Sequence, residues 1–85
     1  MDKRDAAPHD TDDDEVAGRW DAGNLGCGEL VFELRGRLAG SSPGSLFELI
    51  ANDPGATEDL PSWCRMTGHT LVASEHPRYL IRTRT

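Results

Sequence analysis

Hydrophobic and polar positions divide this chain into segments with strand-like and helix-like spacing. Small or apolar residues alternate with others over residues 16–21, which predicts a short strand. Gly and Asn in residues 23–26 then predict a turn. After Cys27 the apolar residues recur at i, i+1, i+4 and i+8, which places them on one face of a helix. These residues are Leu30, Val31, Leu34 and Leu38.

The middle of the chain predicts a buried strand followed by an interrupted helix. Residues 46–51 form a short apolar run between turn residues, which favours a strand. Asp53 is then expected to be the N-cap of the next helix, with Pro54 at its first position. Because proline fits poorly inside a helix, we expect a kink or a restart at Pro61. Gly68 is expected to end this helix.

Two further strands are predicted at residues 70–74 and 78–82, joined as a hairpin through His76 and Pro77. The predicted order is therefore β-α-β-α-β-β. The first β-α-β unit implies two parallel strands with a right-handed crossover. We expect an α+β fold, a two-layer sandwich with two helices on one face of a four-stranded mixed sheet. At 85 residues the chain is long enough for one domain.

Charge separates residues 1–15 from the rest of the chain. The net charge is −6, and residues 1–15 hold seven acidic and two basic residues of the total. We expect this segment to be a disordered acidic tail, either solubilising or a docking arm, ahead of a domain at 16–85. That domain is nearly neutral and has no basic stripe, so we expect no direct nucleic-acid partner.

The number of cysteines and the lengths of the apolar runs indicate the cellular compartment to expect. Two cysteines, Cys27 and Cys64, do not make a disulfide framework typical of small secreted domains. We find no signal-peptide pattern and no apolar run of the roughly 20 residues that a membrane span needs. We therefore expect a cytoplasmic protein without a membrane partner, in which cysteines remain thiols.

Cys27 is the strongest candidate for chemistry. It directly precedes the first predicted helix, where backbone N–H groups and the helix dipole favour a thiolate. A helix N-terminus lowers a cysteine pKa from about 8.5 into a range of roughly 3.5 to 7.5. Gly26 and Gly28 flank the sulfur and leave it open. The alternative is an inert structural cysteine.

The other candidate groups have competing interpretations. Cys64 is either a small buried hydrophobe or an accessory thiol that resolves Cys27. Asp53 and Asp59, with Glu58, suggest either metal or acid–base work, or carboxylates at a helix start. Neither cysteine has a histidine at zinc-site spacing, so we expect no metal site.

Several short motifs, in order, resemble the TusA (SirA-like) sulfur-carrier family. Residues 20–27, Trp-Asp-Ala-Gly-Asn-Leu-Gly-Cys, are similar to the family's Leu-Asp-x-x-Gly-Leu-x-Cys. Pro43-Gly44, the segment 49–54 ending in Asn-Asp-Pro, and the segment 59–64 resemble later family motifs. The resemblance extends over residues 19–83 and implies the same β-α-β-α-β-β fold.

The resemblance implies a persulfide carrier, which needs no cofactor. Cys27 would accept sulfur from a cysteine desulfurase or another donor and pass it to an acceptor protein, for tRNA thiolation, cofactor biosynthesis or sulfur metabolism. The family's Cys-Pro-x-Pro is here Cys27-Gly28-Glu29-Leu30, which removes both prolines. Glu29 also adds negative charge that opposes ionisation of the thiol. Two alternatives remain: a non-catalytic interaction module on the same fold, and a redox switch between Cys27 and Cys64.

Overall fold

The computed structural model describes residues 16–84, so the predicted tail at residues 1–15 lies outside the described residues. The predicted element order is confirmed. The elements are β1 (Val16–Asp21), α2 (Cys27–Ala39), β2 (Leu46–Ile50), α3 (Ala56–Thr67), β3 (Thr70–Glu75) and β4 (Arg78–Arg82).

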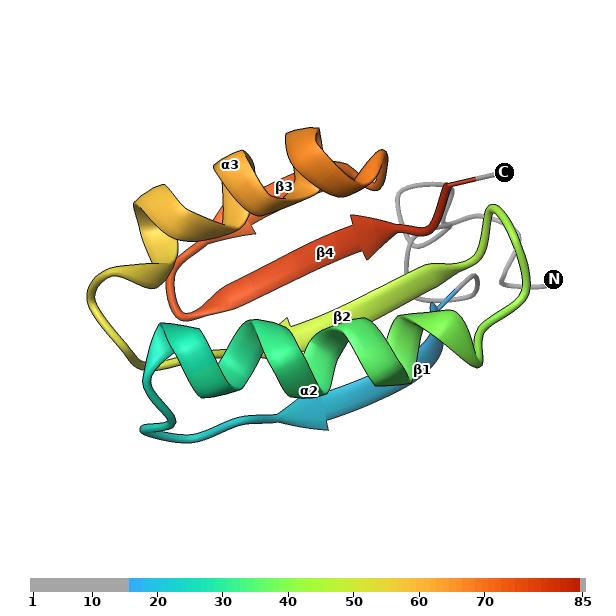
Figure 1. Ribbon diagram of the computed structural model, residues 1–85. Helices are drawn as coiled ribbons and strands as arrows, with labels where there is room; N and C mark the ends of the chain where they lie inside the picture. Colours follow the sequence, from blue (N-terminus) through green and yellow to red (C-terminus); the bar gives the residue numbers. More distant parts are fainter. Residues whose placement is uncertain (1–15, 85) are drawn as a thin grey trace, which may run out of the picture.

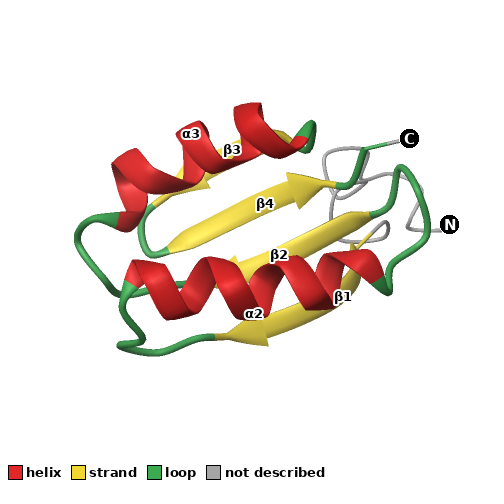
Figure 2. Ribbon diagram, in the orientation of Figure 1, coloured by secondary structure: helices red, strands yellow, loops and turns green. Residues whose placement is uncertain are grey.

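The four strands form one mixed sheet in the order β1-β2-β4-β3. β1 and β2 are parallel, and the other neighbouring pairs are antiparallel. Figures 1 and 2 show both helices on the same face of this sheet, which confirms the predicted α+β two-layer architecture. Both helices begin at the same end of the sheet, so their N-termini are neighbours (Figure 1).

The core lies between the helices and the sheet. The apolar stripe of α2 is buried there through Leu30, Leu34 and Leu38, while Val31 is half-buried at the edge. From the sheet, alternate residues of β2 and β4 face the helices, as the twofold repeat of a strand requires. This shared core fixes α2 against the sheet, and with it the position of Cys27.

The start of α3 differs from the prediction. Gly55, not Asp53, precedes the first helical residue, Ala56, and no side chain caps this end. The prediction of Asp53 as N-cap is therefore wrong. Asp53 instead accepts a hydrogen bond from the Gly55 N–H at 3.1 Å, in a turn that ends before the helix begins. The same carboxylate also accepts a hydrogen bond from Cys27 Sγ.

The helix α3 continues through Pro61, so the restart that the sequence allowed there is not found. Leu60 and Cys64, on either side of Pro61, are both buried in the core. Packing of an apolar face supplies most of the stability of a protein helix, and here it holds the turns before and after the proline in one helix. Gly68 ends α3 as predicted, with φ of 87° and its N–H bonded to the Cys64 carbonyl.

Among residues 16–84, no helix has the length and apolar character needed to cross a membrane.

Candidate functional site

The parallel pairing of β1 and β2 brings two loops together at one end of the sheet. The carboxyl ends of parallel neighbours meet at the same edge, and the loops that follow them are therefore adjacent. The Ala22 N–H bonds to the Ile50 carbonyl at 2.8 Å, and the Asn52 N–H bonds to the Gly23 carbonyl at 2.9 Å. Asn52 Nδ2 also donates a hydrogen bond to Asn24 Oδ1 at 3.3 Å. The loop before Cys27 is thus fixed against the loop that carries Asp53.

Local turns then direct the chain from β1 into α2. The Asp21 carboxylate accepts the Gly23 N–H at 2.9 Å, and Gly23 has φ of 60°, a conformation that glycine adopts without strain. The Leu30 N–H bonds to the Gly26 carbonyl at 2.8 Å, so Gly26 is the N-cap of α2. Cys27 is therefore the first residue of this helix, one position further in than the sequence predicted, and it lies beside the N-cap.

The thiol of Cys27 faces a carboxylate from the neighbouring loop. Cys27 Sγ donates a hydrogen bond to Asp53 Oδ2 at 3.0 Å. Asp59, from the first turn of α3, approaches the same place. A Cβ on Gly55 would lie 3.0 Å from Asp53 Oδ2, 3.5 Å from Asp59 Oδ2 and 3.8 Å from Cys27 Sγ. The fold therefore gathers two carboxylates around one sulfur atom, with Gly55 leaving room for them.

This setting keeps the thiol protonated. Burial is the largest cause, and hydrogen bonding and charge from Asp53 and Asp59 add to it, so the pKa of Cys27 rises from 9.0 to about 12. The prediction of a thiolate stabilised by the helix start is therefore wrong, because desolvation and two carboxylates outweigh the helix dipole. Glu29, expected to act on the sulfur, is exposed and is not among the causes.

A shallow groove adjoins the sulfur. It has a volume of about 270 Å³ and is lined from α2 by Cys27, Gly28 and Val31, and from α3 by Asp59, Ser62, Trp63 and Met66. Met66 is 81% exposed and Cys27 is half-buried, so Cys27 borders a groove that is open to solvent at an apolar edge. Such an arrangement allows another protein's reactive group to approach the sulfur while the thiol remains partly desolvated.

Cys64 occupies a different environment. It is 2% exposed within the core, it does not line the groove, and burial raises its pKa to about 11. Both cysteines are free thiols. The environment of Cys64 is that of a small buried hydrophobe, one of the two alternatives that the sequence left open for it.

Two residues near the site were not singled out from the sequence as a pair. Tyr79, fully buried at the start of β4, has its hydroxyl 2.5 Å from His76 Nδ1. Burial, and secondly the charge of Cys27, raises the pKa of Tyr79, so its phenol stays protonated. The only sequence signal was the position of His76 in the hairpin turn, and nothing local connects it with Cys27.

Within the described part of the chain, no three His, Cys, Asp or Glu side chains converge as metal ligands would. Asp59 and Glu58 lie in the first turn of α3, as the helix-start alternative expected. Asp53 and Asp59 also flank the Cys27 sulfur, a position that suits proton transfer.

Comparison with known families agrees with this geometry. The model for the family described as sulfurtransferase TusA matches residues 19–83, which include the end of β1, all of β2, both helices and the Cys27 loop. The matched segment covers well over half of the chain.

Proposed function

The chain belongs to the TusA sulfurtransferase family, and on that premise we propose that it carries sulfur as a persulfide on Cys27. Family membership suggests a sulfur-carrier role in general terms. The observation that supports the specific assignment is the hydrogen bond from Cys27 Sγ to Asp53 Oδ2, on an accessible thiol beside an apolar groove. It gives the sulfur a proton acceptor at the moment when it becomes a nucleophile.

Loading is a thiol–persulfide exchange. The Cys27 sulfur attacks the outer sulfur of a donor persulfide while its proton passes to Asp53. A bond forms between Cys27 Sγ and that outer sulfur, the S–S bond of the donor breaks, and the donor leaves as a thiolate that takes up a proton. One thiol and one persulfide are exchanged for another thiol and persulfide, so no oxidant or reductant is consumed.

Delivery reverses these steps. An acceptor nucleophile attacks the outer sulfur of the Cys27 persulfide, and Cys27 departs with the electron pair of the broken S–S bond. Because a thiol with a pKa of about 12 is a poor leaving group, protonation from Asp53 assists its departure. The partners in this proposal are a cysteine desulfurase or another sulfur donor and a downstream acceptor protein, in the cytoplasm.

The loss of the family's prolines is compatible with this role. A Cβ at either Gly26 or Gly28 would meet nothing within 4 Å, so both glycines leave the approach to the sulfur open. The helix still begins at Cys27, because its first turn is fixed by the Gly26 carbonyl and by burial of Leu30. Packing thus provides the helix start that proline provides in the usual motif.

Loading is tested by intact mass after incubation with a cysteine desulfurase and cysteine. We expect the wild-type protein to gain the mass of one sulfur atom, reversibly with a reducing thiol. Cys27→Ser should gain none, and the matched control Cys64→Ser should gain as much as the wild type. A wild-type protein that stays unmodified, although its Cys27 is alkylated once unfolded, would contradict the proposal.

A second candidate, an interaction module without sulfur transfer, is favoured by the altered Cys-Gly-Glu-Leu segment and by the raised Cys27 pKa. The same experiment separates the two, since a pure binding module takes up no sulfur. A redox switch between the cysteines predicts instead that Cys64→Ser changes the product, because a disulfide requires both thiols.

A further inference from the structure

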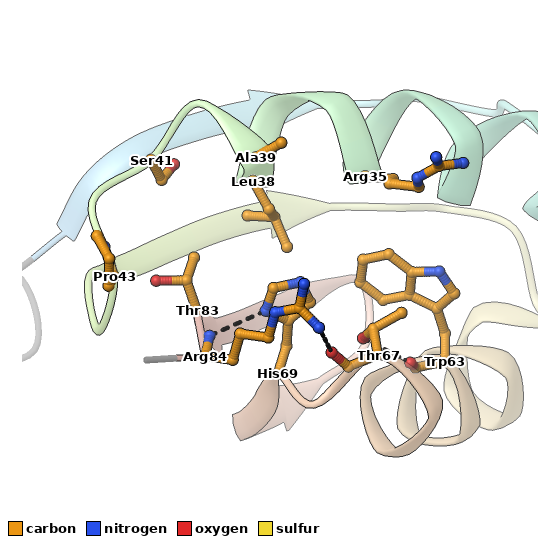
Figure 3. Close-up of a pocket in the computed structure, with 10 residues that line it drawn as sticks. All are labelled: Arg35, Leu38, Ala39, Ser41, Pro43, Trp63, Thr67, His69, Thr83 and Arg84. Atoms are coloured by element: carbon orange, nitrogen blue, oxygen red, sulfur yellow. Dashed lines mark hydrogen bonds between the residues drawn. The ribbon is translucent and has the colours of Figure 1, made fainter.

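A second cleft opens between the C-terminal halves of α2 and α3, at the opposite end of the helices from Cys27 (Figure 3). Its volume is about 480 Å³, within the roughly 300–1,000 Å³ typical of small-molecule sites. Leu38 and Thr83, both buried, form part of its wall. Trp63 lines both this cleft and the Cys27 groove, so the two are adjacent. Cys27 lines the groove but not the cleft.

Among residues 16–84, the charged side chains around this cleft are of one sign. Arg35 of α2 and Arg84 after β4 line it together with His69, and no Asp or Glu of this part of the chain does. The protein as a whole has 15 acidic and nine basic residues, so the cleft is not a typical sample of its surface. Within residues 16–84, Arg35 makes no hydrogen bond or ion pair. Its guanidinium is therefore available to a ligand.

His69 and Arg84 also provide hydrogen-bond donors at this cleft. His69 Nδ1 accepts the backbone N–H of Arg84 at 3.0 Å, so the proton of the neutral ring lies on Nε2. The Arg84 guanidinium donates from Nη1 to the Thr67 carbonyl at 2.9 Å, which holds it on the wall and leaves its other N–H groups for a ligand. Donors without a facing carboxylate select an anion.

One wall is flat and apolar. The Trp63 indole packs against the His69 ring at 5.5 Å between centroids, tilted by 33°, and Figure 3 shows the two rings with Arg84 beside them. Leu38, Ala39 and Pro43 supply further apolar surface. A planar, apolar group is the natural complement of such a wall, with its charge directed to the arginines.

We propose that this cleft binds a small organic anion, a carboxylate or phosphate attached to a planar apolar body, with the anion on Arg35 and Arg84 and the planar part against Trp63. The inference is independent of sulfur carriage, because Cys27 does not line the cleft.

The test is titration with phenyl phosphate and with benzoate. Binding is measured by calorimetry and by the chemical shifts of backbone amides. We expect saturable binding, with the largest shifts around residues 35–41 and 67–69. The tighter of the two probes identifies phosphate or carboxylate as the preferred anion. Benzylamine, which has the same ring and a positive charge, should not bind. Binding of the amine as tight as that of the anions would overturn the proposal.

Variants separate the cleft from the rest of the surface. Arg35→Gln should weaken binding of the better probe about tenfold or more, since a charge-assisted contact is lost, and Trp63→Leu should also weaken it. The matched control is Arg65→Gln, an exposed arginine of α3 outside the cleft. Cys27→Ser should bind like the wild type. Absence of saturable binding by both anions, or unchanged affinity in Arg35→Gln, would refute the proposal.

Discussion

At the scale of single residues, the decisive feature is the proton between Cys27 and Asp53. A thiolate at a helix start and a thiol held by a carboxylate imply different chemistry at rest. The thiol held by a carboxylate is present here, so resting Cys27 is protected from oxidation and alkylation, which require the thiolate. The reactivity of the resting thiol is therefore expected to be limited by its small thiolate fraction, which the Asp53 carboxylate lowers further.

Asp53→Asn tests this control of the thiol. The substitution removes one negative charge beside the sulfur and leaves the effect of burial, so the pKa of Cys27 should fall from about 12 towards its ordinary value. Each unit of decrease raises the thiolate fraction about tenfold and lowers its intrinsic nucleophilicity about threefold, a net gain of about threefold in the alkylation rate. The measurement is the iodoacetamide rate on a Cys64→Ser background.

Glu29→Gln is the matched control, since Glu29 is close in sequence but exposed. Its alkylation rate should equal that of the parent protein. If Glu29→Gln accelerates alkylation as much as Asp53→Asn does, the carboxylate of Asp53 does not have the role assigned to it.

Stability should decrease in alkaline solution because of the same thiol. The unfolded chain loses the Cys27 proton near pH 9.0, whereas the folded protein keeps it until about pH 12. Between these values the unfolded state binds fewer protons, so the free energy of unfolding falls as pH rises. Urea unfolding of Cys27→Ser should show a smaller fall between about pH 8 and about pH 10.5 than the wild type. Equal falls in the two proteins would contradict this.

At the scale of elements, packing accounts for the points at which local rules fail. Pro61 is a local argument against a continuous helix, but buried residues on both sides keep α3 in one piece. Asp53 has the sequence context of an N-cap, yet its carboxylate is used by Cys27 and by the Gly55 N–H. Where no tertiary contact competes, as at Gly68, the local prediction is confirmed.

Two glycines should respond with opposite sign to alanine. Gly36 lies mid-helix in α2 with nothing within 4 Å of an added Cβ, so Gly36→Ala should raise the free energy of unfolding by about 1 kcal/mol. Gly68 has φ of 87°, so Gly68→Ala should lower it by about 1–2 kcal/mol, the cost of a left-handed conformation. Urea unfolding measures both, and a stabilising Gly68→Ala would refute the second expectation.

At the scale of the whole molecule, the helix-free face of the sheet is held by a charged bridge. Glu48 on β2 accepts hydrogen bonds from Arg19 Nε of β1 at 2.6 Å and from Arg78 Nε of β4 at 2.5 Å. These strands are neighbours in the sheet, and the carboxylate is only 16% exposed. The hydrogen bond from Arg78 is the largest cause that lowers the pKa of Glu48. The bridge therefore joins the parallel pair that positions Cys27 to the centre of the sheet.

Glu48→Gln should destabilise the fold by about 1 kcal/mol at neutral pH, since a partly buried charge-assisted bridge is lost. Because the folded pKa of Glu48 lies below 4.5, the bridge is intact above that pH and is lost as pH falls through the folded value. The difference from the wild type in urea unfolding should therefore shrink in acid. Glu33→Gln, at an exposed position of α2, should have no such effect.

Much of this molecule could be predicted from its residues. The apolar spacing after Cys27, the short apolar run at residues 46–51 and the hairpin near the C-terminus gave the order of elements, since strand and helix periods are local properties. The site was predictable only in part. Cys27 was singled out as the candidate, whereas Asp53 and Asp59 had two interpretations, and the contact between His76 and Tyr79, three positions apart, was not expected.

The sequence by itself determined the family resemblance, the α+β order and the position of a cysteine at a helix start, because these depend on short segments. Only the tertiary structure decided the state of that cysteine. Asp53 is 26 positions from Cys27 in sequence, and the parallel pairing of β1 and β2 brings its carboxylate to 3.0 Å from the sulfur. Burial and charge act through space, so the proton on Cys27 is set by the assembled fold.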